Sequence, residues 1–221
     1  MRSKLLLVLA FMSALAARPV SAQVVEELLY DPRGITEGLM VGLRLGFVPG
    51  TTLTGERQFE GIEVATTWGS GGGVMVGYGI TPQLLMFGSV DQSAHDSDNA
   101  RIVGNITLYH FDFGARFHFH LRDVRYVPYA SLAFGGKQLY TRTFIDTLGV
   151  SRRATINARA IIPGAGLQFF FSENFAFDAN LSLSLGSFHK IDVAGGGRQS
   201  LQSDGGTTSR MSVGVNWYPE R

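Results

Sequence analysis

The segment from Phe175 to Phe188, FAFDANLSLSLGSF, alternates between apolar and polar or small residues over nearly its whole length. Successive side chains of an extended chain point to opposite faces, so the alternation predicts a β-strand with two unlike faces. The first face carries Phe175, Phe177, Ala179, Leu181, Leu183 and Leu185. The second face carries Ala176, Asp178, Asn180, Ser182, Ser184 and Gly186. The fold and the function both depend on which of these faces meets water.

The same period of two recurs along the chain. Together with the opening segment it predicts eight strands, the other seven being residues 37–48, 73–80, 83–90, 106–121, 125–136, 157–171 and 209–218. The pattern leaves open which residues of 83–90 share a face. Pro163 lies inside one strand and cannot donate a ladder hydrogen bond, so we expect a bulge or a distorted ladder there. No segment has the period of an amphipathic helix, and the chain is predicted to be all-β.

The predicted strands are joined alternately by short and long segments. Short links are expected near 81–83, 122–124 and 172–174, and long polar loops near 49–72, 91–103, 137–156 and 189–207. Long connections at one end and short turns at the other are typical of an eight-stranded antiparallel up-and-down transmembrane β-barrel.

The N-terminus has the composition of an export signal. Arg2 and Lys4 precede an apolar run, and Val20-Ser21-Ala22 supplies small residues before a cleavage site, so residues 1–22 are predicted to be a signal peptide. Residues 23–36 are expected to form a short periplasmic lead-in, and residues 37–221 the barrel domain. The predicted localisation is therefore the bacterial outer membrane.

Composition limits the function classes. The chain has 28 Gly and no Cys, which excludes disulfides, thiolate metal sites and cysteine nucleophiles. Removing residues 1–22 takes away three of the 19 basic residues and none of the 18 acidic ones, which leaves 16 against 18, a net charge near −2. Nucleic acid is therefore not an expected partner.

The chemistry of the two faces indicates which one is wet. In the clear spans the large apolar face carries no charge, and a cation on the lipid face at the bilayer midplane costs about 2–4 kcal/mol. The predicted lipid-facing residues are Leu43, Leu45, Phe111, Phe113, Phe117, Leu181, Leu183, Val213 and Val215. The predicted polar network of the lumen comprises Arg44, His110, Asp112, Arg116, His118, His120, Asp178 and Asn180. An aromatic girdle is expected from Tyr126, Phe169, Phe171, Phe175 and Trp217. A soluble secreted barrel remains the alternative.

Several segments resemble a known family, the small outer-membrane β-barrel proteins of the OmpA/OmpX type. They are GYGITPQLLMFGSV (77–90), PYASLAFGG (128–136), PGAGLQFFFSENFAFDANLSLSLG (163–186) and MSVGVNWYP (211–219), within a resemblance that spans roughly 37–218. The resemblance implies the eight-stranded fold and insertion by the barrel-assembly machinery, but no particular activity. The family usually ends on an aromatic residue, whereas this chain continues past Trp217 and Tyr218 to Arg221.

Other candidate sites have plainer readings. His118 and His120 would need a third ligand from another strand to hold a metal, so no metal or cofactor is predicted. Ser182 and Ser184 share a face with Asp178, but small lumen residues explain them better than an acyl-hydrolase site. The run 91–101, DQSAHDSDNAR, is read as a solvated loop, with weak Ca²⁺ binding as the alternative. Basic residues in or beside the outer loops are expected to pair with lipid A phosphates: Arg142, Arg152, Arg153, Lys190, Arg198 and Arg210.

These observations predict an outer-membrane barrel with a structural, adhesive or surface-recognition role through its long loops. A lumen of eight strands is just wide enough for side chains to fill. A narrow channel for ions or small solutes is the first alternative, and a lipid A or phospholipid-modifying enzyme the second. The expected partners are outer-membrane lipids, lipopolysaccharide and an unidentified extracellular ligand.

Overall fold

A computed structural model of the chain describes residues 36–53, 66–97, 105–119, 125–145, 151–194 and 197–219. The predicted signal peptide and most of the predicted lead-in lie outside these residues. The strands are β1 (Gly38–Leu53), β2 (Thr66–Gly79), β3 (Leu84–Ser97), β4 (Ile106–His118), β5 (Tyr126–Ile145), β6 (Ser151–Phe170), β7 (Phe175–Val193) and β8 (Gly197–Trp217). Among the described residues no helix is long and apolar enough to span a bilayer.

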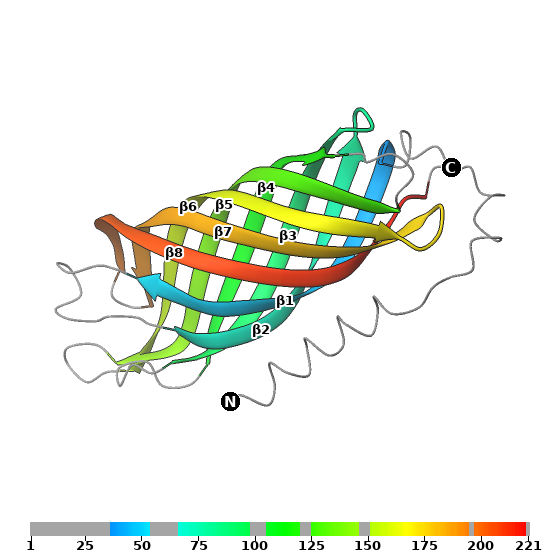
Figure 1. Cartoon of the computed structure of the whole chain (residues 1–221). Coiled ribbons are helices and arrows are strands. Elements are labelled where there is room, and N and C mark those ends of the chain that lie inside the picture. The colour runs from blue at the N-terminus through cyan, green and yellow to red at the C-terminus, as the bar shows by residue number, and fades with distance from the viewer. Residues whose placement is uncertain are drawn as a thin grey trace, which may run out of the picture. The chain divides into compact units, whose positions relative to one another are not determined.

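The eight strands form a closed antiparallel barrel in which each strand pairs with its neighbours in sequence and β1 pairs with β8 (Figure 1). This confirms the predicted fold class. Closure leaves no free sheet edge within the barrel wall. The β1–β8 seam runs in register from Val41–Trp217 to Phe47–Met211 and then shifts by one residue before Gly50–Ser209.

One end of the barrel carries tight turns. Between β2 and β3, the Ile80 amide donates to the Leu84 carbonyl at 2.9 Å, and the Leu84 amide donates to both the carbonyl and the hydroxyl of Thr81 at 3.1 Å. Between β6 and β7, the Phe175 amide donates to Ser172 Oγ at 3.1 Å. The predicted turns 81–83 and 172–174 are therefore present, and we call this the turn end of the barrel.

At the opposite end, called the loop end, much of the predicted loop sequence is strand. β5 to β8 contain 19–21 residues, against 13–16 for β1 to β4. Most of the predicted loops 137–156 and 189–207 belongs to these longer strands. Period-two alternation arises only where one face of a strand is apolar and the other is polar. Near the loop end both faces can be polar, so the alternation disappears there. The predicted strands are therefore shorter than the observed ones.

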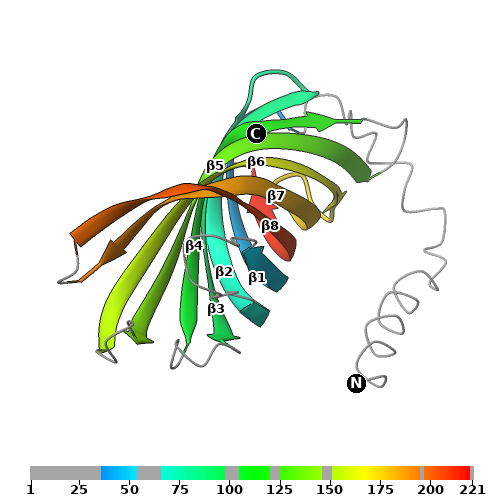
Figure 2. The same cartoon turned by 90° about the vertical axis from the view of Figure 1, so that its left-hand side faces the viewer.

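The β7–β8 hairpin reaches beyond the seam with β1. The last β1–β8 pair is Leu53–Gly206, whereas β7 and β8 continue to the pair Val193–Gly197. In Figure 2 the tip of this hairpin projects to the left, away from the outer ends of β3 and β4 lower in the view.

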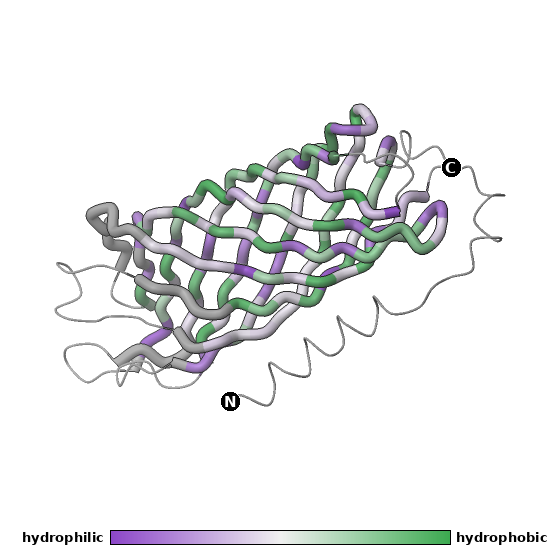
Figure 3. Tube along the Cα trace, in the orientation of Figure 1, coloured by the Kyte–Doolittle hydropathy of each residue, from purple (hydrophilic) through white to green (hydrophobic). Residues whose placement is uncertain are grey.

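Hydropathy alternates along the strands around the barrel wall (Figure 3). Eight of the nine predicted lipid-facing residues have exposed side chains on the outer surface, and Val215 is half-buried. Leu43 and Leu45 are the most exposed of them, at 64% and 65%. In β3, whose facing the sequence pattern does not determine, Leu85, Phe87 and Ser89 point inward and Val90 points outward.

The interior contains more than the predicted polar network. Large apolar side chains also fill it, with Met40, Met75, Leu85 and Phe170 buried near the turn end. Further along the barrel the buried apolar side chains are Ile106, Leu108, Leu139, Ile156 and Phe188. The polar network is therefore one part of a mixed core, because apolar packing at both ends completes the filling of the narrow lumen.

Pro163 interrupts one ladder without a bulge. On the β5 side it pairs in register with Leu132. On the β7 side the pairs pass from Ile161–Leu185 to Gly164–Ser182 with the same register, and Ile162 and Pro163 are skipped. The ladder is thus distorted as expected, while the one-residue register shift of the β6–β7 ladder lies elsewhere, between the pairs Ala158–Phe188 and Asn157–Lys190, where β7 has the extra residue.

Candidate functional site: the charged interior

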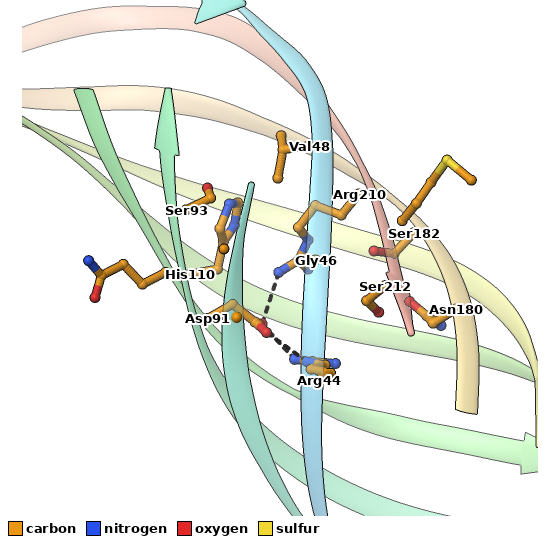
Figure 4. A pocket seen from close by; sticks show the side chains of 14 residues that line it. Arg44, Gly46, Val48, Asp91, Ser93, His110, Asn180, Ser182, Arg210 and Ser212 are labelled. Atoms are coloured by element: carbon orange, nitrogen blue, oxygen red, sulfur yellow. Dashed lines mark hydrogen bonds and ion pairs between the residues drawn. The ribbon is translucent and has the colours of Figure 1, made fainter. Parts of the chain in front are cut away.

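A four-residue ion network crosses the barrel interior. Arg44 of β1 makes a two-pronged contact with Asp91 of β3, with Nε to Oδ1 at 2.6 Å and Nη2 to Oδ2 at 2.5 Å. Arg210 of β8 reaches the same Asp91 Oδ2 at 3.3 Å and Asp112 Oδ2 of β4 at 2.5 Å. The two arginines and two aspartates balance in charge, which suits a poorly hydrated interior. Figure 4 shows Asp91 between Arg44 and Arg210.

Inward-facing glycines make room for these carboxylates. A Cβ atom at Gly73 would lie 2.1 Å from Asp91 Oδ1, and one at Gly135 would lie 2.3 Å from Asp112 Oδ1. Gly73 and Asp91 are direct partners across β2 and β3, as are Asp112 and Gly135 across β4 and β5. These glycines are therefore needed beside the carboxylates, because any larger side chain at either position would collide with an aspartate.

A second polar cluster lies nearer the turn end and is centred on Asp178 of β7. Arg116 Nη1 contacts Asp178 Oδ2 at 2.6 Å, and the Tyr129 hydroxyl donates to Oδ1 at 2.7 Å. Asn216 Nδ2 and Gln168 Nε2 also donate to Oδ2, at 2.8 and 3.3 Å. The Arg116 guanidinium lies 4.3 Å from the centre of the Tyr129 ring, in the range of a cation–π contact. The buried carboxylate thus has donors from four other strands.

Lys137 of β5 is the centre of a third group of buried polar contacts, on the loop-end side of Gly135. Its Nζ donates to Thr208 Oγ1 at 2.9 Å and to the Ser184 carbonyl at 3.4 Å, and the residue is 2% exposed. Across the ladder Lys137 is the direct partner of His110. Neither ring nitrogen of His110 has a hydrogen-bond partner among the described residues.

A small cavity of about 30 Å³ adjoins the ion network. Its lining includes Arg44, Asp91, His110, Ser182 and Arg210 (Figure 4). This volume admits one or two water molecules, which would find polar partners on several sides. Nothing of substrate size fits into it.

The structure brings most of the predicted lumen residues together inside the barrel. Arg44, His110, Asp112, Arg116, His118 and Asp178 are inward, and Asn180 Nδ2 donates to the Tyr129 hydroxyl at 3.1 Å. His118 packs edge-on against the Tyr129 ring. His120 lies outside the described residues. No group of three His, Cys, Asp or Glu residues in the described part of the chain is arranged to hold a metal ion.

Two predictions for the loop end are wrong. Asp91 belongs to β3 and binds two arginines inside the barrel, so the run 91–97 is strand and not a solvated loop. Arg210, expected in or beside an outer loop, also points into the interior. The sequence pattern of β3 does not determine which residues share a face, so it could not assign Asp91 to the lumen, whereas the outward Val213 and Val215 of β8 imply that Arg210 points inward.

The serine candidates are not arranged as a catalytic pair with His110. Ser182 lines the cavity together with His110, but neither ring nitrogen of His110 forms a hydrogen bond with any residue that the structure describes. Ser184 Oγ is likewise without a partner in that part of the chain. Both serines occupy the inward face of β7 as small side chains.

The predicted aromatic girdle gathers at the turn end. Tyr126 stacks on Phe169 with 4.9 Å between ring centres, and Phe171 stacks on Phe175 at 6.1 Å. Trp217, the last residue of β8, pairs with Phe175 across the ladder. Four of the five side chains are exposed and Phe169 is half-buried.

One outward charge was missed. Arg159 of β6 is exposed on the outer surface, in line with Ile161 and Phe169. The sequence could have shown this, because Phe169 and Phe171 are predicted to face outward and the odd-numbered residues of a strand, Arg159 among them, share one face.

Comparison with known proteins identifies the fold. No family model and no curated protein matches the sequence. Among solved structures, Neisserial surface protein A matches with a TM-score of 0.57 at 12% identity, over 82% of this chain and 97% of that one. The outer membrane protein OprG from Pseudomonas aeruginosa matches with 0.58 at 10%, over 82% and 96%. Outer membrane protein AlkL matches with 0.53 at 13%, over 82% and 90%. The chain thus has the fold of small eight-stranded outer-membrane barrels.

Proposed function

We propose that the chain is an integral outer-membrane barrel that does not conduct and that acts through its loop end, in a structural, adhesive or surface-recognition role. The observation that carries this proposal is the filled interior, where Arg210 of β8 contacts Asp112 of β4 across the full width of the lumen at 2.5 Å. Since its own side chains fill the lumen, the barrel would not act as a route for solutes along its axis, and its function would lie in its loop end.

Four successive layers of side chains support a closed lumen. Buried Met40, Met75 and Leu85 fill the turn end, the Asp178 cluster and the ion network follow, and buried Ile106, Leu108 and Leu139 lie beyond them. A water path would have to break two ion-paired clusters and two apolar layers.

The long strands support a role for the loop end. Because β7 and β8 remain paired beyond the last β1 contact at Gly206, they present a protruding hairpin on that side of the barrel. In an outer membrane this hairpin would face the exterior, surrounded by lipopolysaccharide, after insertion by the assembly machinery.

A narrow channel is the second candidate, and the cavity beside Arg44, His110 and Arg210 favours it. Electrical recording from the purified, refolded chain in planar bilayers separates the two functions. We expect no unitary current steps from the full chain under conditions in which a general porin conducts. Reproducible steps from the full chain would overturn the closed-lumen proposal in favour of the channel.

A further inference from the structure

The outer surface of β5, β6 and β7 changes abruptly from apolar to polar along the barrel. Phe134, Ile161 and Leu185 form the last apolar row, and their exposed fractions are 63%, 49% and 46%. The next row towards the loop end is Gly136, Arg159 and Ser187. The row after that is Gln138, Asn157 and Lys190.

The height of Arg159 matches the edge of a hydrocarbon layer. Arg159 lies ten residues along β6 from Phe169 of the turn-end girdle. With a rise of about 3.4 Å per residue and a tilt of about 40°, this corresponds to about 26 Å along the barrel axis. The apolar band of outer-membrane barrels is about 25 Å tall. Arg159 therefore sits one membrane thickness away from the girdle.

Arg159 has no anionic partner of its own in the described part of the chain. Its direct ladder neighbours are Gly136 and Ser187, whose small side chains leave it exposed. Lys190 lies diagonally across the β6–β7 ladder, since its direct partner is Asn157. Diagonal positions are about 7–8 Å apart, so both long side chains can reach one anion between them. Lys190 contacts Asp192 at 3.4 Å, which occupies only part of its donor capacity.

We propose that Arg159 and Lys190 form a binding site on the barrel wall for a phosphate group of lipid A, in the outer leaflet. This inference rests on the proposed function, which places the loop end outside. A cation beside hydrocarbon is costly unless it meets a negative charge, and at this height the available anions are the phosphates on the lipid A sugar. Asn157, hydrogen-bonded to Gln138 Nε2 at 3.3 Å, supplies a neighbouring amide.

The test uses the full chain refolded in lipid nanodiscs and measures the binding of bisphosphorylated lipid A by native mass spectrometry. The variants are Arg159→Gln, Lys190→Gln and both together, with Arg125→Gln as a matched loss of an exposed arginine at the turn end. A basic residue near an anionic surface contributes about 1 kcal/mol, so we expect the double variant to bind about thirtyfold more weakly. Arg125→Gln and the charge-preserving Arg159→Lys should stay within a fewfold of the wild type.

Comparing three lipids shows whether the site recognises the phosphate groups of lipid A. Dephosphorylated lipid A and phosphatidylglycerol should bind the wild-type chain much more weakly than the bisphosphorylated form. Equal binding of either ligand, equal affinity of the double variant, or an equal loss in Arg125→Gln would overturn the site. Insertion is measured first, by the heat-dependent gel shift of each protein. A wild-type chain that fails to insert refutes the proposed function, whereas one that inserts without preferring phosphorylated lipid A refutes only the site.

Discussion

Arg210 and Asp112 meet across the barrel interior from strands on opposite sides of the wall, with 2.5 Å between Nη2 and Oδ2. The contact joins residues 98 positions apart in the chain. Through Asp91 it connects to Arg44, so the wall is tied together at four strands, β1, β3, β4 and β8. These ion pairs brace the barrel across its axis.

Removing the charge of Asp178 should destabilise the barrel severely. Asp178→Asn leaves Arg116 as a buried cation without a counter-charge, and breaking a buried pair in this way costs about 3–5 kcal/mol. The free energy of unfolding in urea, measured in lipid vesicles, reports the loss. Glu37→Gln removes an exposed acid and serves as the control, with a change of at most about 0.5 kcal/mol.

Adjacent glycines of β5 should respond differently to alanine. A Cβ at Gly135 would collide with Asp112 Oδ1, at 2.3 Å, and with Ile162 Cδ1, at 2.8 Å. At Gly136 the nearest atom is the Ala158 carbonyl oxygen, 3.9 Å away. Overpacking predicts that Gly135→Ala lowers the free energy of unfolding by about 1–3 kcal/mol, while Gly136→Ala leaves it nearly unchanged. Equal effects of the two variants would contradict the role assigned to Gly135.

Trp217 should lie at a membrane interface. The chain has two tryptophans, so Trp68→Phe leaves Trp217 as the single fluorophore. Because Trp217 belongs to the turn-end girdle, lipids brominated near the headgroup should quench its emission more strongly than lipids brominated near the end of the acyl chain. The reverse order of quenching would place the girdle at the bilayer centre and refute its assignment.

The sequence alone predicts the fold because a membrane barrel imposes one pattern on every strand. Phe111 and Phe113 alternate with Asp112 and Arg116 along β4, and one face of the strand meets the outside while the other meets the lumen. The same rule fails at Asp91, since the flanking run QLLMFGSV has apolar residues on both faces. Leu85 and Phe87 fill the lumen while Met86 and Val90 lie on the outside.

The partners within the site depend on geometry that no local pattern contains. Asp178 and Tyr129 are 49 residues apart, and their contact requires the stagger of all eight strands. The sequence pattern places Lys137 in an outer loop and Arg210 in or beside one, because the apolar alternation fades near both residues. The outward facing of Arg159 follows from that of Phe169 by counting along one strand. Its position at the edge of the apolar band, however, depends on its height in the barrel.

The most direct test of the account concerns the outer surface of β7. The chain has no cysteine, so Phe177→Cys, Leu181→Cys, Leu183→Cys and Leu185→Cys each give a single site for a spin label. In barrels refolded into lipid vesicles, all four labels should collide frequently with dissolved oxygen and rarely with a water-soluble nickel complex. Labels that instead collide mainly with the nickel complex would show this face to be in water and contradict the membrane barrel.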